Sequence, residues 1–467
     1  MRKTYIALIN SLILLATIGL FVSCDFFPYE PISVTLNNNI QPINELKSPE
    51  IKNRIWSILI YMAADNDLEA AAMEDLFEME VSKLNTKEVS IFVLLDRSDS
   101  HDTSNKDWTG SKLFKLNTGR SRECKTIISE EIPCESLGMY KDKYTELDMA
   151  SGYTLSTILD YIKKQYPAEQ LGLIMWGHGT GWRGKDNNEN VVKGFAYDRS
   201  TGNSMTLKQM GDGIERALNN EQLDFLGLDT CCGGEIEVMY ELRNRAKYAV
   251  GTEGLLLYSG WNYETIWNNF QRSVDKSPRE LSIICKKSFE QQYGLSTSAS
   301  ICCVDMSKMN DYFRKFDLVM QNIANDITNK EIRDKNFNCL YAPSHCITKS
   351  YSYGETDSDV YLDINSAINT CLLNLEENEL LNNLINDFNT IEKQCIFSKW
   401  SSDTTNSGLG VYFGTLTSGN LISKAHNKAY MKNSMMEQIQ FVKDSSGYVP
   451  GQLGENSFID KLFYCDY

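Results

Sequence analysis

Two apolar segments that each end in a reactive side chain limit the folds open to this chain. Residues 171–176 lead directly to Gly-His178-Gly, and residues 224–229 lead to Thr-Cys231. Continuous apolar runs of this length are typical of strands buried on both faces of a parallel sheet. The carboxyl ends of parallel strands lie along one edge of the sheet, where sites usually form. We therefore expect the histidine and the cysteine to face each other across that edge.

The chain up to residue 305 alternates apolar strands with helices. Strands are expected at residues 54–62, 88–95, 171–177, 223–229, 247–251 and 298–305, and helices at about 66–82, 150–166, 206–219, 234–244 and 278–293. This alternation predicts an α/β fold in which helices cover both faces of a mostly parallel central sheet. Asn66 and Glu69 fit the start of the first helix as a capping box. Residues 306–467 form a helix-rich C-terminal region with one clear strand at 409–413.

The first 53 residues lie outside this pattern. Residues 1–24 combine a charged start, an apolar stretch and a closing Ser-Cys24, which is typical of a secretory signal. The ending resembles the lipobox of bacterial lipoproteins and implies lipidation of Cys24; an ordinary signal peptide and an uncleaved anchor are the alternatives. Residues 25–53 then form a flexible tether. We expect an exported protein held at a membrane, in the periplasm or on the cell surface.

Composition excludes several classes of function. The chain of 467 residues has a formal net charge of −16, which makes nucleic acid a poor partner. None of the 13 cysteines forms a CxxC pair, so no structural zinc site is expected. Cys302 and Cys303 lie in an apolar run and are expected to be buried thiols.

A histidine and a cysteine at neighbouring strand ends can act as a base and a soft nucleophile. A helix expected to begin near Gly233 would place its amino terminus beside Cys231 and favour the thiolate. The backbone N–H groups of Gly179 and Cys231 are candidates to stabilise a developing oxyanion. The alternative for Cys231, a buried inert thiol, stays open on the residues alone.

Several ordered motifs resemble those of the clostripain-type cysteine peptidases, relatives of caspases, legumains and gingipains. The matching segments are residues 61–69 (Tyr-Met-Ala-Ala-Asp-Asn-Asp-Leu-Glu), 176–179 (Trp-Gly-His-Gly), 229–231 (Asp-Thr-Cys), 260–263, 300–306, 359–363 and 408–413. The resemblance covers residues 54 to about 415. It implies a caspase-like αβα sandwich, with a catalytic core at 54–305 and a C-terminal subdomain at 306–467 that completes the peptidase. His178 would be the base and Cys231 the nucleophile of a Cys-His dyad that acts through an acyl-enzyme.

The resemblance also implies cleavage after Arg or Lys, with acidic side chains in the primary substrate pocket. Asp229 occupies the matching position; its alternative role is to cap the following helix. Ser259 stands where the family often has a second pocket acid, and Glu253 or Glu264 could compensate. Cys232 follows the nucleophile directly, so a strained, inactivating disulfide between the two cysteines is a further hypothesis.

Relatives of this kind can be activated by a cut between the histidine and cysteine strands. The loop there offers three basic residues for self-cleavage: Arg183, Lys185 and Lys193. No cofactor is expected. Some relatives need calcium, and the loop acids are Asp186, Glu189 and Asp198, but no EF-hand pattern is present and the ion is not placed.

The leading hypothesis is a lipid-anchored cysteine endopeptidase that acts as a monomer on protein or peptide substrates. A catalytically inactive binding lipoprotein of the same fold is the alternative. An acyltransferase or ligase that uses the same thioester chemistry is a third possibility.

Overall fold

The computed structural model describes residues 54–182, 194–295, 299–326, 346–353, 357–373, 375–402, 408–417, 420–421 and 439–447. All of these belong to one compact unit, Ile51–Tyr467. The expected signal segment and tether lie outside the described residues. No described helix is both long enough and apolar enough to cross a membrane.

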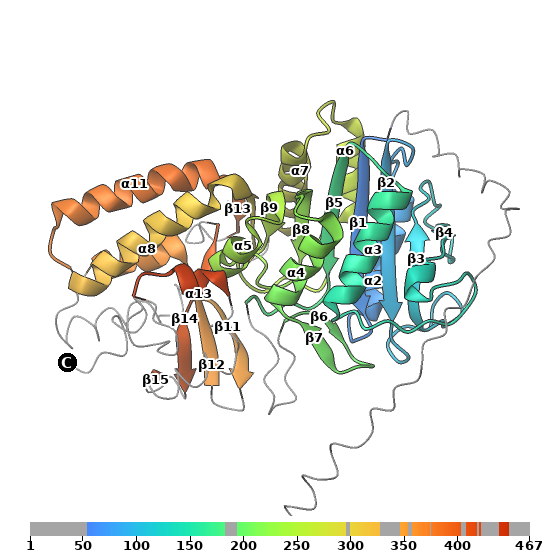
Figure 1. The fold of residues 1–467 in the computed structure, drawn as a ribbon, viewed down its shortest axis with the longest axis horizontal. Coiled ribbons are helices and arrows are strands. Elements are labelled where there is room, and N and C mark those ends of the chain that lie inside the picture. The colour runs from blue at the N-terminus through green and yellow to red at the C-terminus, as the bar shows by residue number, and fades with distance from the viewer. Residues whose placement is uncertain are drawn as a thin grey trace, which may run out of the picture. The chain divides into compact units, whose positions relative to one another are not determined.

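A nine-stranded sheet forms the centre of this unit (Figure 1). Its spatial order is β13 (Ile396–Ser401), β10 (Ser300–Asp305), β9 (Ala246–Gly251), β8 (Leu223–Asp229), β5 (Gln170–Trp176), β1 (Trp56–Ala64), β2 (Val89–Arg97), β3 (Gly110–Lys115) and β4 (Glu130–Glu131). The five strands from β9 to β2 pair in parallel. The predicted α/β fold with a mostly parallel centre is confirmed. Both ends of the sheet are antiparallel, which the apolar pattern did not predict.

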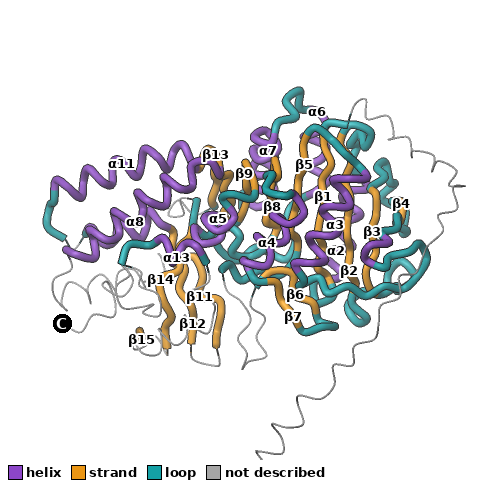
Figure 2. Tube along the Cα trace, viewed as in Figure 1, coloured by secondary structure: helices purple, strands orange, loops and turns teal. Residues whose placement is uncertain are grey.

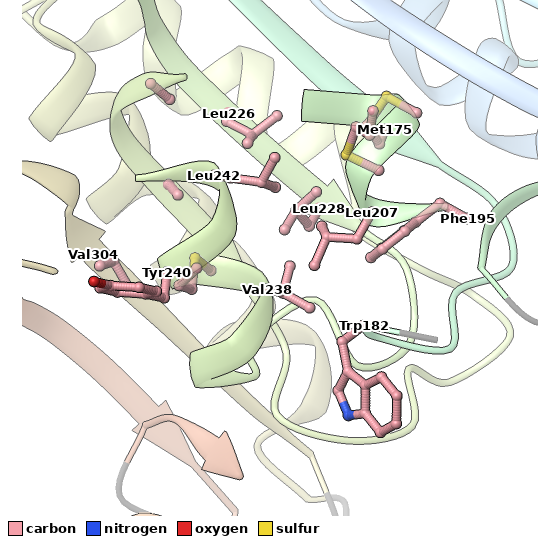
Figure 3. Close-up of a cluster of buried hydrophobic side chains, with 14 of the residues drawn as sticks. Met175, Trp182, Phe195, Leu207, Leu226, Leu228, Val238, Tyr240, Leu242 and Val304 are labelled. Atoms are coloured by element: carbon pink, nitrogen blue, oxygen red, sulfur yellow. The ribbon is translucent and has the colours of Figure 1, made fainter. Parts of the chain in front are cut away.

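Helices cover both faces of the sheet (Figure 2). One face carries α2 (Glu69–Val81), α6 (Tyr263–Arg272) and α7 (Pro278–Tyr293); the other carries α3 (Gly152–Gln165), α4 (Leu207–Leu218), α5 (Ile236–Leu242) and α8 (Met309–Asp326). Alternate side chains of β1 enter opposite cores, with Tyr61 on the α3 side and Ile60 on the α2 side. This two-sided burial explains why the strands read as continuous apolar runs. On the side of α4 and α5, Leu226 and Leu228 of β8 lie in one hydrophobic core with Leu207 of α4 and Leu242 of α5 (Figure 3).

Local sequence signals account for several helix starts. Thr206 and Gln209 form a capping box at α4, and Ser277 caps α7 just before Pro278. The capping box predicted for Asn66 and Glu69 is wrong, because Glu69 is itself the first residue of α2. Its carboxylate instead accepts hydrogen bonds from buried Arg97, at 2.7 Å, and from nearby backbone.

The C-terminal region contains more strand than the sequence indicated. The structure describes a four-stranded antiparallel sheet of β11 (Cys346–Tyr353), β12 (Asp357–Asp363), β14 (Gly410–Thr417) and β15 (Asn420–Leu421). Its described helices after α8 are α10 (Ile364–Leu372), α11 (Glu379–Cys395) and α13 (Gln440–Asp444). Strand β13 returns to the main sheet beside β10, so this region completes the edge of the core.

Candidate active site

The register of two central strands brings the histidine and the cysteine to the same edge. Strands β5 and β8 are parallel neighbours, and Trp176 is the register partner of Asp229. The pairing extends one residue further, because Gly177 N donates to the Asp229 carbonyl oxygen at 3.3 Å. His178 and Cys231 each lie two residues beyond these partners. They therefore leave the sheet side by side, as expected.

Glycines allow the two strand ends to approach closely. A Cβ built on Gly179 would clash with the carbonyl oxygen of Cys231 and lie 2.8 Å from the Cβ of Thr230. Gly177 has a φ of 134°, and a Cβ there would lie 3.0 Å from the Ala63 carbonyl oxygen. Any larger residue at 179 would therefore push the histidine loop away from the cysteine loop.

A pocket of about 270 Å³ opens at this edge. Its lining residues are Asp67, Leu68, Trp176, Gly177, His178, Asp229, Cys231, Leu256, Leu257, Tyr258 and Gly260. The candidate base and the candidate nucleophile thus share one cleft. None of its lining residues is a lysine or an arginine.

The imidazole of His178 is held by a carboxylate that the sequence did not single out. Its Nε2 lies 2.7 Å from Asp67 Oδ1, and the two side chains are 34% and 69% exposed. Burial alone would raise the pKa of Asp67, but the hydrogen bond with His178 and the imidazole charge lower it below its ordinary value. Asp67 sits in the turn between β1 and α2, at the same edge as β5. The sequence signal that could have identified Asp67 is its position just after β1, the strand that lies beside β5.

The Cys231 thiol is held by the backbone of a neighbouring loop. Leu256 N donates to Sγ at 3.2 Å, and the thiol contacts the Leu256 carbonyl oxygen at 3.8 Å. The sulfur forms no hydrogen bond with His178 in the described structure. Burial raises the pKa of the Cys231 thiol, the Leu256 N–H partly offsets this, and the Asp229 charge adds to the rise. The predicted lowering by a helix terminus is wrong, because α5 begins only at Ile236.

The adjacent Cys232 points away from this chemistry. It is fully buried with a φ of 57°, and its N–H donates to the Gly254 carbonyl oxygen at 2.7 Å. Cys231 and Cys232 are not joined by a disulfide, so the bond considered between them is not formed here. Cys302 and Cys303 are buried free thiols, as predicted.

Asp229 lies at the base of the pocket and is only 2% exposed. Its Oδ2 accepts from the Tyr263 hydroxyl at 2.7 Å, whereas its buried Oδ1 has no hydrogen-bond partner. Burial raises the pKa of Asp229 to about 7, although the Tyr263 hydroxyl opposes the rise. Asp229 therefore faces the pocket and does not cap the distant start of α5.

A second buried acid, Asp75 of α2, lies beside Asp229. A Cβ built on Gly260 would be 3.3 Å from Asp229 Oδ1 and 3.6 Å from Asp75 Oδ2. Asp75 accepts from Trp176 Nε1 at 2.7 Å, and burial together with the Asp229 charge raises its pKa well above the ordinary value. The sequence did not indicate Asp75, since only the packing of α2 against the sheet brings it there.

The other candidates for a second pocket acid lie elsewhere. Ser259 is exposed in the turn between Tyr258 and Gly260 and is not a lining residue. Glu253 is buried and accepts from Gly408 N, and Glu264 pairs with Arg122 at 2.6 Å. Six residues that the sequence analysis singled out lie outside the described ranges: Cys24, Arg183, Lys185, Asp186, Glu189 and Lys193.

Comparison with known proteins decides the family. The sequence model of the clostripain family matches residues 60–461. The chain belongs to the clostripain family. Clostripain of Hathewaya histolytica is 23% identical over 370 residues, which cover 72% of this chain and 69% of that protein. As a member of this family, the protein is a cysteine endopeptidase.

Solved structures with the same fold are proteases of this family. An inactive zymogen C11 protease from Parabacteroides distasonis has a TM-score of 0.57 and 19% identity, covering 84% of this chain and 98% of that one. A secreted C11 cysteine protease from Bacteroides thetaiotaomicron, in complex with an irreversible peptide inhibitor, has a TM-score of 0.56 and 18% identity, covering 84% and 99%. The predicted caspase-like fold is confirmed.

Proposed function

We propose that this clostripain-family endopeptidase cleaves peptide bonds after Arg or Lys, with Cys231 as the nucleophile and His178 as the acid and base. The observation that carries the proposal is the register of β5 and β8. Because Trp176 pairs with Asp229, the two reactive side chains enter one pocket directly above a buried carboxylate. The ends of β5 and β8 thus supply both the reacting groups and the carboxylate of Asp229, which would select a cation.

The chemistry proceeds in two halves. The Cys231 thiol gives its proton to His178, and the sulfur attacks the carbonyl carbon of the scissile bond. The backbone N–H groups of Gly179 and Cys231 stabilise the oxyanion. His178 returns the proton to the leaving amine as the C–N bond breaks, which leaves a thioester on Cys231. A water molecule, deprotonated by His178, then hydrolyses the thioester and frees the enzyme.

Two contacts support this division of roles. Nε2–H of His178 donates to the Asp67 carboxylate, so Nδ1 is the nitrogen that exchanges protons with the sulfur. Asp67 would then act as a positioning residue that fixes the orientation of the ring. The Leu256 N–H, which lies 3.2 Å from Sγ, favours the thiolate that burial disfavours.

Specificity for a basic residue follows from uncompensated negative charge. Asp229 offers a buried oxygen without a hydrogen-bond partner, and Asp75 lies beside it. An ammonium or guanidinium group that enters the pocket satisfies this oxygen and stabilises both carboxylates as anions. Ser259, the position of the second acid in many relatives, would contribute no charge.

Export, lipidation at Cys24 and self-cleavage at Arg183, Lys185 or Lys193 complete the proposal. The Bacteroides thetaiotaomicron relative is described as secreted and the Parabacteroides distasonis relative as an inactive zymogen. We propose the same route of export here, a lipid anchor in the periplasm or at the cell surface, and a monomeric enzyme. Protein that stays a single intact band while it turns over substrate would contradict self-cleavage.

Fluorogenic peptides that end in Arg, Lys or the neutral arginine analogue citrulline test the activity. We expect the Arg and Lys peptides to be cleaved by the native protein and by Cys124→Ala, which removes a partly exposed thiol outside the pocket. Cys231→Ala and His178→Ala should lose activity while keeping the native circular dichroism. Cleavage that survives in folded Cys231→Ala would refute the assignment of the nucleophile.

A further inference from the structure

An exposed apolar segment lies in the loop between β9 and α6. Residues 254–260 read Gly-Leu-Leu-Leu-Tyr-Ser-Gly, and three of the side chains are open to solvent: Leu255 is 47% exposed, Leu257 40% and Tyr258 57%. Leu256, between them, is half-buried and packs against the core. Contiguous exposed apolar side chains in a folded protein mark binding surfaces. Packing among the described residues does not account for these three side chains, which indicates a role in binding.

Two of these side chains belong to the wall of the pocket. Leu257 and Tyr258 line it together with Cys231, whereas Leu255 does not. Because both are exposed while Asp229 at the base is buried, Leu257 and Tyr258 form the rim of the pocket. The rim therefore presents an aliphatic and an aromatic side chain beside the opening through which a basic side chain would enter.

Hydrogen bonds on both sides of the rim hold its backbone in place. On one side, Leu256 N donates to Cys231 Sγ at 3.2 Å. On the other side, Gly260 N donates to the Leu257 carbonyl oxygen at 2.9 Å, and the buried Tyr293 hydroxyl donates to the Gly260 carbonyl oxygen at 2.8 Å. The apolar side chains thus stand on a backbone that is ordered before a ligand binds, so binding to them loses little conformational entropy.

The order of the strands indicates which half of a substrate meets this rim. The sheet runs β9-β8-β5-β1, so Cys231 lies toward β9, and His178 with its partner Asp67 lies toward β1. His178 protonates the leaving amine, which therefore departs on the β1 side, while the acyl half of the substrate stays on Cys231. The loop that follows β9 and donates to the sulfur then lies along the acyl half, which contains the residues before the scissile bond.

We propose that Leu257 and Tyr258 bind an apolar side chain of the substrate residue immediately before the basic one. This role rests on the proposed attack by Cys231. Neighbouring residues of an extended peptide lie about 3.8 Å apart and point their side chains in opposite directions. When one side chain fills the pocket above Asp229, the preceding side chain therefore stays at the mouth, beside the rim. An aliphatic or aromatic side chain is removed from water there, whereas glycine buries nothing and a carboxylate would lose hydration.

A digest of a denatured protein mixture, with Cys231→Ala as the blank, tests both positions separately. Mass spectrometry of the products identifies the residue before each cut, which tests the preference for Arg or Lys, and the residue preceding that one, which tests the rim. We expect Leu, Ile, Val, Met and Phe to be enriched about threefold at this second position. Cuts after other residues would refute the basic specificity, yet apolar enrichment at the second position would still support the rim. No apolar enrichment there, or enrichment of Lys and Arg, would overturn the proposal.

Two fluorogenic peptides that differ only before the arginine, Leu-Arg and Gly-Arg, measure the size of the effect. The native enzyme should cleave the Leu-Arg peptide with a kcat/KM about tenfold higher, because a leucine side chain is buried against the rim. Tyr258→Ser and Leu257→Ser each remove one side of the rim and should reduce this ratio to about threefold or less. Both side chains are exposed, so the variants should fold as the native protein does.

Tyr153→Ser and Leu318→Ser are the matched controls. Tyr153 of α3 is 60% exposed and Leu318 of α8 is 42% exposed, close to the values for Tyr258 and Leu257, and neither lines the pocket. Both controls should keep the native ratio of the two kcat/KM values. A rim that merely supported Cys231 would lower both rates alike in Tyr258→Ser and leave the ratio unchanged. That result, or a native ratio close to one, would overturn the proposal.

Discussion

Replacing Asp229 with Asn isolates the charge at the base of the pocket. Asparagine keeps the shape and an oxygen that accepts from the Tyr263 hydroxyl, but it cannot ionise. Losing one partner of a buried charge pair costs about 2–4 kcal/mol, equivalent to a fall of about 30- to 1,000-fold in kcat/KM. We expect this fall for Arg and Lys peptides and little change for the citrulline peptide. Dividing kcat/KM for the Arg peptide by kcat/KM for the citrulline peptide cancels any effect of the substitution on His178 and Cys231, because both peptides use the same reacting groups.

The same ratio should depend on pH in the native enzyme. With the pKa of Asp229 raised to about 7, roughly a tenth of the free enzyme carries the negative charge at pH 6 and nine tenths at pH 8. The preference for Arg over citrulline should therefore rise about tenfold between these values. Burial and the Asp229 charge raise the pKa of Asp75 well above its ordinary value, so Asp75 is neutral where Asp229 titrates, and Asp75→Asn should leave the midpoint of the rise unchanged.

Stability provides an independent check on the same carboxylate. A folded-state pKa raised from 3.8 to about 7 means that folding favours the neutral form of Asp229. Its contribution to stability is fully present below pH 3.8 and is lost as the pH rises through about 7. Asp229→Asn should accordingly raise the Tm at pH 8 and change it little at pH 4. An unchanged Arg-to-citrulline ratio in folded Asp229→Asn at pH 8 would refute the reasoning.

Three further variants test the framework around the site. Gly179→Ala should fold but lose at least about 100-fold in kcat/KM, because the added methyl collides with the Cys231 carbonyl oxygen; a rate within tenfold of native would show that the two loops tolerate separation. Cys232→Ala should match the native enzyme with and without reductant, since this thiol is fully buried and forms no disulfide with Cys231. Glu69→Ala leaves buried Arg97 with only the more distant Asp102 carboxylate, at 3.8 Å, and should lower the free energy of unfolding by about 3–5 kcal/mol; urea titration that shows under 1 kcal/mol would argue against it.

The sequence predicted the central strands and the reactive pair because those signals are local. A strand buried on both faces must be apolar along its length, so β5 and β8 are visible as apolar runs in the sequence. Their register, with Trp176 opposite Asp229, is a finding of the structure. His178 and Cys231 follow these runs directly, and glycines mark the close approach. The motifs that resemble clostripain extend the same information over most of the chain, as the family match confirmed.

The tertiary structure alone decided which acids serve which role. Asp75 reaches Asp229 only because α2 packs under the sheet, and Asp67 reaches His178 only because β1 lies beside β5. The antiparallel edge strands likewise join segments that are distant along the chain. Such contacts produce no periodic pattern in the sequence. A single polar residue in a loop cannot be assigned from the sequence to solvent, to a protonated state or to a partner side chain. Local patterns therefore determine the scaffold and the reacting pair, while long-range packing determines the charges that tune them.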